Sequence, residues 1–146
     1  SGNMGQTVCN TNGIVEKYVC EKKICLRPCV DEHEDVHVTQ LTSCCKNFGK
    51  CMEKAAGYER KENKCCRVYA TWEKKMSDYN ECEAWKSTVS CFDRETEKFH
   101  TPSCPCWADM KYAKKRSRQK AAEHCGRARP TQPIRCRIND QGDFVS

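Results

Sequence analysis

The sequence lacks several features that would assign a function directly. It has no apolar run long enough to span a membrane and no N-terminal hydrophobic leader, so we expect a mature secreted form. It contains no phosphate-binding P-loop, no G-x-G-x-x-G pattern and no G-x-S-x-G nucleophile motif. These absences argue against a membrane-spanning protein and against the common nucleotide-binding and serine-hydrolase classes.

Cysteine pairs with C-x2-C spacing are also absent, although 15 of the 146 residues are cysteines. Zinc ribbons and fingers use that spacing, and Cys104-Pro105-Cys106 only approaches it, so we do not expect a zinc scaffold. Apolar residues make up 38% of the chain, cysteine included, which leaves a thin core. We therefore expect a secreted, extracellular disulfide scaffold, in which each disulfide adds about 2–4 kcal/mol of stability.

An odd number of cysteines leaves at least one without a partner in its own chain. That residue is either a free thiol or half of an intermolecular bridge, and for a secreted protein we favour the bridge. A disulfide-linked homodimer is the resulting hypothesis. A cysteine nucleophile would need a histidine partner and a lowered pKa, and we do not expect one where disulfides consume the cysteines.

Two long segments have the spacing of amphipathic helices. Apolar and cysteine residues recur at intervals of three and four across residues 39–57, and the glycine at the end would cap this helix. Cys44 and Cys45 point about 100° apart on it, so one helix can be bonded to two different neighbours. Residues 65–92 contain no glycine or proline and carry a second apolar stripe, which predicts one long helix, or two with a bend.

Shorter elements complete the predicted fold. A first helix is expected over residues 13–24 and a last one over residues 103–126, with a serine N-cap. Residues 1–12 and the C-terminal tail are expected to be irregular, since no run of strand-forming residues exceeds about four. The prediction is an all-α fold: a disulfide-stapled bundle of about four helices, two of them long and antiparallel. It forms a single domain over residues 1–146, with its core at 13–125.

The basic residues are concentrated near the C-terminus. Residues 111–137 contain ten Lys or Arg and one acidic residue, whereas the rest of the chain contains 16 basic and 19 acidic residues. A local basic face is a candidate contact for an anionic ligand or partner. Its candidate residues are Lys111, Lys114, Lys115, Arg116, Arg118, Lys120, Arg127 and Arg129. Heparan sulfate or an anionic membrane suits a secreted chain better than nucleic acid, and a merely solvated basic face is the alternative.

Residues 30–38 are rich in acidic side chains and contain His33 and His37. On a helix these two histidines would share one face, with carboxylates nearby, and could bind a metal ion. We interpret the segment as a solvated acidic loop that follows a turn at Pro28. No metal ion and no cofactor are therefore predicted.

The run Cys44-Cys45-Lys46-Asn47-Phe48-Gly49-Lys50-Cys51 resembles the active-site helix of secreted phospholipase A2, whose motif is C-C-x-x-H-D-x-C. Fourteen residues separate Cys29 from the cysteine pair, as in that family. The segment from Cys82 to Phe92 is similar to the second long helix of the family, C-x-C-D-R-x-x-x-x-C-F. The resemblance covers roughly residues 25–92 and implies a scaffold of stapled helices.

The departures from this family decide what the resemblance implies about activity. Phe48, Gly49 and Trp85 occupy the positions of the water-activating histidine, the calcium-binding aspartate and the aspartate that orients the histidine. Phenylalanine cannot accept a proton, glycine offers calcium no side-chain ligand, and tryptophan accepts no hydrogen bond. The glycine-rich calcium loop is also missing. We therefore expect a catalytically inactive relative and no enzyme.

The resemblance also implies disulfides. Cys29–Cys45 and Cys44–Cys91 would match family pairs, whereas the expected partner of Cys51 falls at Ala84. The cysteines assigned to the scaffold in this way are Cys29, Cys45, Cys44, Cys91, Cys51 and Cys82.

The predicted function is that of a secreted, non-enzymatic binding protein of the toxin, effector or ligand type, with an extracellular or cell-surface protein as its partner. A heparin- or anionic-membrane-binding module acting through residues 111–137 is one alternative. Another is a channel-directed toxin, because Cys44 to Met52 resembles the C-C-x5-C-M segment of cone-snail con-ikot-ikot toxins. An active phospholipase is the least favoured alternative, given the missing acid–base pair.

Overall fold

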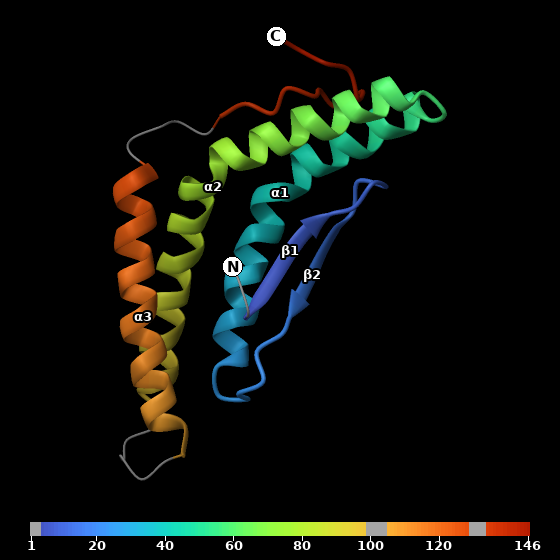
Figure 1. Cartoon of the computed structure of the whole chain (residues 1–146). Coiled ribbons are helices and arrows are strands. Elements are labelled where there is room, and N and C mark those ends of the chain that lie inside the picture. Colours follow the sequence, from blue (N-terminus) through green and yellow to red (C-terminus); the bar gives the residue numbers. More distant parts are fainter. Residues whose placement is uncertain (1–3, 99–104, 129–133) are drawn as a thin grey trace.

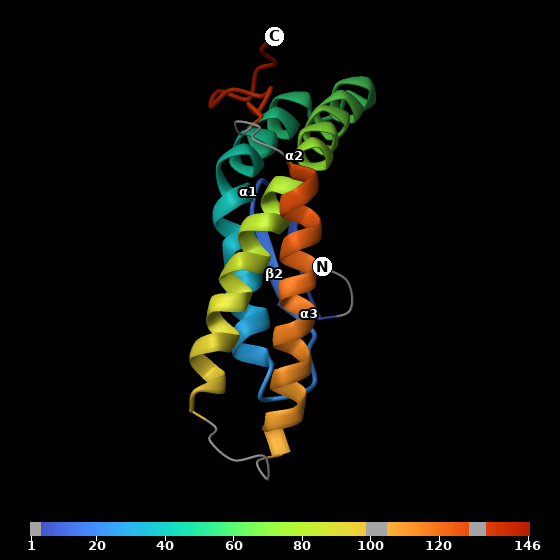
Figure 2. The ribbon, with the colours of Figure 1, turned by 90° about the vertical axis from the view of Figure 1, so that its left-hand side faces the viewer.

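The computed structural model describes residues 4–98, 105–128 and 134–146. In chain order its elements are β1 (Gly5–Cys9), β2 (Val15–Val19), α1 (Arg27–Ala55), α2 (Glu59–Thr96) and α3 (Pro105–Ala128). Helix α2 packs against both α1 and α3, and the β1–β2 hairpin packs against α1 (Figures 1 and 2). The predicted helical, disulfide-stapled fold is confirmed, with three helices and a small two-stranded sheet in place of four helices.

Helices α1 and α2 are the two long antiparallel helices that the apolar spacing predicts. The turn between them contains Gly57, whose positive φ of 87° suits a residue without a side chain. Both helices bend partway along their length, so that the end of α1 and the start of α2 point together away from the axis of the rest of the bundle (Figure 1). The predicted acidic loop over residues 30–38 is wrong, because α1 already begins at Arg27. Pro28 lies in the first turn of α1, where its missing N–H costs no hydrogen bond.

Helix α3 begins at Pro105 and is longer than expected at its other end. Gly126 does not end it, and the helix continues to Ala128. The predicted N-cap, Ser103, lies outside the described residues.

The predicted helix over residues 13–24 is wrong, and so is the irregular start of the chain, because β1 and β2 form an antiparallel hairpin. Two local features explain it. Gly13 adopts a positive φ of 80° in the turn, and the Asn10 side-chain oxygen accepts hydrogen bonds from the Asn12 and Ile14 backbone N–H groups, at 2.9 and 3.1 Å. Such an asparagine–glycine turn is a strong hairpin signal that the apolar spacing alone does not reveal.

Six disulfides connect these elements: Cys9–Cys45, Cys25–Cys106, Cys29–Cys91, Cys44–Cys136, Cys51–Cys65 and Cys82–Cys125. The two pairs implied by the phospholipase resemblance, Cys29–Cys45 and Cys44–Cys91, are therefore wrong. Cys29 bonds to the end of α2 instead, and the adjacent Cys44 and Cys45 are bonded to the C-terminal tail and the hairpin. Their divergent directions on α1 carry them to two different neighbours, as expected. Cys51 pairs with Cys65 across the α1–α2 turn rather than with the region of Ala84.

The tail is irregular, as predicted, and a disulfide ties it back to α1. Cys136 holds it to Cys44 on α1, and the Ile138 side chain, 1% exposed, joins the core between α1 and α2. The Asn47 side-chain amide donates to the Ile138 carbonyl at 2.9 Å. The C-terminal segment is therefore part of the packed core and not an appendage.

Two glycines allow the hairpin to lie directly on α1. A Cβ atom at Gly49 would lie 2.5 Å from Gly13 Cα and 2.7 Å from the Asn12 carbonyl oxygen, and neither backbone group can move away freely. The position that the phospholipase resemblance assigns to a calcium ligand is therefore occupied by glycine for packing reasons.

We predict that Gly49→Ala lowers the free energy of unfolding by about 1–3 kcal/mol, because the methyl group overpacks a backbone contact. The matched control is Gly126→Ala on α3, where a Cβ meets nothing within 4 Å. That change should be neutral or stabilising by up to about 1 kcal/mol, because alanine is the better helix former. Urea unfolding followed by circular dichroism measures both, and equal effects of the two substitutions would contradict the contact.

Candidate functional site

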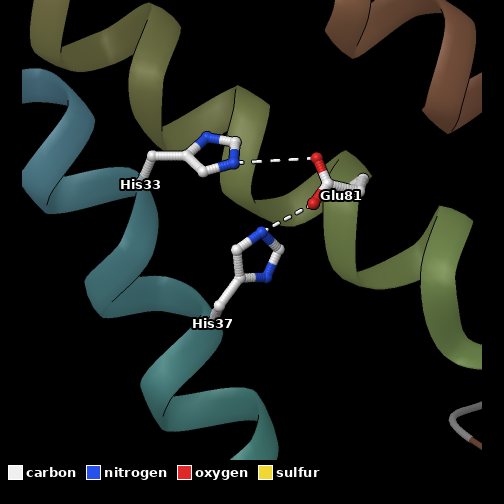
Figure 3. A group of neighbouring side chains, drawn as sticks. All are labelled: His33, His37 and Glu81. Atoms are coloured by element: carbon white, nitrogen blue, oxygen red, sulfur yellow. Dashed lines mark ion pairs between the residues drawn. The ribbon is translucent and has the colours of Figure 1, made fainter. Parts of the chain in front are cut away.

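Two buried histidines on α1 and one glutamate on α2 form the most distinctive polar cluster in the described residues. His33 and His37 are four residues apart on the same face of α1, and Glu81 reaches them from α2 (Figure 3). Glu81 Oε2 lies 3.6 Å from His33 Nε2, and Oε1 lies 2.7 Å from His37 Nε2. The ligand atoms of the three residues all lie within 4.8 Å of one another.

The other ring nitrogen of His33 is held by a threonine on α2. His33 Nδ1 lies 2.8 Å from Thr88 Oγ1, and the Thr88 hydroxyl donates to the Ala84 carbonyl at 2.9 Å. Because a hydroxyl has one proton to give, the ring nitrogen must donate to Thr88. Nδ1 therefore carries the proton, and Nε2 is the atom turned toward Glu81.

His37 has the same arrangement with a glutamine. His37 Nδ1 lies 2.8 Å from Gln40 Oε1, while Gln40 Nε2 donates to the Asn80 carbonyl at 3.0 Å. The second contact fixes the amide orientation, so the oxygen faces the ring and can only accept. Nδ1 of His37 is therefore also protonated, and its Nε2 also points at the glutamate.

This arrangement leaves an electrostatic conflict for a neutral ring. Neither Nε2 atom makes a hydrogen bond of acceptable geometry within the described part of the chain, although both are buried. An Nε2 lone pair that faces a carboxylate is repelled unless a positive charge lies between them. Burial by itself lowers the pKa of His37, but Glu81 outweighs it, and the net pKa is raised above its usual 6.5. Burial likewise raises the pKa of Glu81, but the two imidazoles hold it well below its usual 4.5.

The pKa shifts predict a window of pH in which the cluster stabilises the metal-free fold. The raised pKa of His37 adds stability that is present below about pH 6.5 and lost as the pH rises through the folded-state pKa. The lowered pKa of Glu81 adds stability that is present above about pH 4.5 and lost as the pH falls through its folded-state value. Both contributions are complete between these limits.

In EDTA we therefore expect Glu81→Gln to cost about 3 kcal/mol near pH 5.5 and less at pH 3 or pH 9, because it breaks a buried ion pair. Urea unfolding at the three pH values measures the difference from wild type. Glu83→Gln, which removes an exposed carboxylate from the same helix, is the control and should change stability by less than about 0.5 kcal/mol. A cost for Glu81→Gln that does not vary with pH would contradict this electrostatic account.

The sequence alone points to two of the three residues of this cluster. The sequence places His33 and His37 as possible metal ligands on one helix face, but the predicted solvated loop is wrong, since α1 buries the two residues to 2% and 8% exposure. Glu81 was missed because only the antiparallel packing of α1 on α2 brings it close. A usable signal was present: His33-Glu34-Asp35-Val36-His37 has the H-E-x-x-H spacing that places two metal ligands on one helix face.

An open groove reaches the cluster from the side of the hairpin. It has a volume of about 620 Å³, lies between β1, α1 and α2, and is lined by His37, Glu81 and Thr7 among others. Glu34 also borders it, but its side chain is fully buried, and its carboxylate accepts a 2.8 Å hydrogen bond from the Thr7 hydroxyl. The cluster is therefore accessible to an ion or a water molecule through the groove.

The three positions that depart from phospholipase A2 are packed in the interior. Phe48, 5% exposed, contacts the Tyr69 ring with centroids 5.1 Å apart. Trp85, 3% exposed, packs edge-on against the His33 ring at 4.5 Å. Gly49 receives the hairpin, as described above. Each of the three residues thus has a structural role in the core.

The predicted basic face on α3 is partly neutralised by acidic residues of α2. Lys114 and Arg118 contact Asp93 at 2.9 and 3.4 Å, and Arg127 contacts Asp78 at 3.1 Å. Lys120 lies 3.8 Å from Glu123 on its own helix, and Arg129 lies outside the described residues. Three candidates make no ion pair within the described residues, and we call them the free basic set: Lys111, Lys115 and Arg116. Beside them lies Tyr112, which is 69% exposed.

No protein-family model matches the chain, and no curated protein or solved structure shows significant similarity to it. Among the described helices, none combines the length and the apolar character needed to cross a membrane. The six disulfides indicate an oxidising, extracellular or secreted environment.

Proposed function

We propose that this is a secreted, non-enzymatic binding protein that presents a rigid helical surface to an extracellular or cell-surface protein. The observation that supports this most is the disulfide network, which bonds the hairpin, all three helices and the tail into one unit. A surface fixed in this way loses little conformational entropy when a partner binds, so more of the contact energy appears as affinity. A channel-directed toxin of the con-ikot-ikot type is the more specific form of this proposal.

The relation to phospholipase A2 stays a proposal that rests on the sequence pattern of residues 25–92. In this proposal the chain uses a stapled helix pair but cannot activate water, since Phe48, Gly49 and Trp85 are packing residues. An active phospholipase would release fatty acid from vesicles in a calcium-dependent manner. We expect no release above the rate of a reduced and alkylated sample.

The binding proposal predicts saturable attachment of the fluorescently labelled protein to cell surfaces. Mild surface proteolysis of the cells should abolish the signal, because the proposed partner is a protein, whereas heparinase treatment should leave it intact. The reduced and alkylated chain is the matched control and should not bind, because it has lost its shape. Loss of binding after heparinase alone, or equal binding of the alkylated chain, would contradict the proposal.

A disulfide-linked homodimer belongs to the same proposal. Within the described residues Cys20 and Cys66 are unpaired and exposed, and the end of β2 and the start of α2, to which they are close in sequence, lie apart (Figure 1). Either thiol is therefore placed to react with a second chain rather than with the other.

We predict a dimer on non-reducing gels that reductant converts to monomer. Of the variants Cys20→Ser and Cys66→Ser, the one that no longer forms the dimer identifies the bonded cysteine. A dimer retained in the double variant would assign the bridge to another cysteine. A monomer under non-reducing conditions would remove the dimer from the proposal.

A second candidate function is contact with an anionic surface through α3, because the free basic set lies beside the exposed Tyr112. Lys111→Glu with Lys115→Glu should weaken binding to vesicles rich in anionic lipid on the order of 30-fold, at about 1 kcal/mol per basic residue. The matched control is Lys22→Glu with Lys46→Glu, which changes net charge equally at exposed positions outside α3. Co-sedimentation measures both pairs, and an equal loss would indicate only a net-charge effect.

A further inference from the structure

We propose that His33, His37 and Glu81 form a binding site for one divalent transition-metal ion, with zinc as the ion that this ligand set favours. Two imidazole nitrogens and a carboxylate oxygen are ligands that zinc accepts, and three protein ligands with a fourth position left open are a common zinc arrangement. This site is independent of the partner-binding function proposed above.

The spacing of the three residues suits a single ion. Zinc binds nitrogen and oxygen ligands at about 2.0–2.1 Å, so two ligands of a tetrahedral site lie about 3.3 Å apart. The Glu81 oxygens lie 2.7 Å from one histidine Nε2 and 3.6 Å from the other, which brackets that separation. All three ligand atoms lie within 4.8 Å of one another, so side-chain rotations that bring them closer together would place them around one ion.

The surroundings have the form expected around metal-binding histidines. Such histidines donate their second ring N–H to a fixed acceptor, which orients the ring and leaves the other nitrogen as the ligand. Thr88 accepts from His33, and Gln40 accepts from His37; each acceptor is itself fixed by a hydrogen bond to a backbone carbonyl. Both Nε2 atoms are then aimed at the glutamate without a hydrogen bond from any described residue, and more than nine-tenths of each histidine is buried. A metal ion would remove this conflict.

The fourth ligand position faces the groove, because His37 and Glu81 border it. Water from the groove can complete the coordination. We assign an ion-binding role rather than a hydrolytic one, because Glu34, which follows His33 in the H-E-x-x-H pattern, is buried and its carboxylate accepts the Thr7 hydroxyl. The ion would join α1 to α2 between two disulfides that also join them, Cys29–Cys91 and Cys51–Cys65.

The experiment uses the folded chain with its exposed Cys20 and Cys66 thiols alkylated, because thiolates also bind zinc. After treatment with EDTA and its removal, titration with zinc against a competing chromogenic chelator should show one equivalent bound. The midpoint of thermal unfolding should rise by about 5–10 °C at a zinc concentration 100 times the dissociation constant. Cobalt should give the intense visible absorption of a four-coordinate site, whereas weak octahedral bands would contradict the assignment.

Three substitutions test the residues. His37→Gln and Glu81→Gln should each weaken zinc binding roughly 100-fold or more, and Thr88→Val roughly 10- to 100-fold by releasing the His33 ring. The control is His124→Gln, which removes a histidine that contacts Asp78 outside the cluster, and it should leave the affinity unchanged. If Glu81→Gln does not fold, three measurements still test the site: the zinc stoichiometry of the wild type, its cobalt spectrum, and the zinc affinity of Thr88→Val. No stoichiometric binding to wild type, or equal affinity in all the variants, would overturn the proposal.

Discussion

The disulfides that join α1 to α2, to the hairpin and to the tail are the constraint on which the rest of the structure depends. Its four cysteines are all disulfide-bonded: Cys29 and Cys51 to α2, Cys45 to the hairpin and Cys44 to the tail. A chain with so few apolar residues cannot fix the relative positions of its elements by burial alone. The crosslinks restrict the unfolded chain, and a modest core then suffices to select one arrangement.

The parts of the fold that were predicted correctly are those where one face of a helix is buried over many turns. The spacing from Leu41 to Ala55 and from Cys65 to Phe92 repeats often enough to outweigh local ambiguity. The hairpin was missed for the opposite reason. Its strands have five residues each, and the apolar residues of β2, Val15, Tyr18 and Val19, also fit a helical spacing in so short a window.

The disulfide pairing and the buried cluster share a second kind of unpredictability. Both depend on which residues of separate elements come into contact. A sequence pattern predicts only the direction in which side chains point from one helix or strand. The divergent directions of Cys44 and Cys45 were readable, but their partners, Cys136 and Cys9, were not. In the same way, the spacing of His33 and His37 predicts that they share one helix face, whereas Glu81 becomes their neighbour only through the packing of α2 on α1.

The burial of Ile138 and the Cys44–Cys136 bond have a consequence for how the molecule is made. During synthesis α1 emerges long before its last crosslinking partner, so Cys44 must stay reduced, or pair wrongly and be reshuffled, until Cys136 has been synthesised. Its neighbour Cys45 can bond to Cys9 as soon as α1 leaves the ribosome. In an oxidising compartment the hairpin can therefore be attached to α1 before the tail is bonded to it.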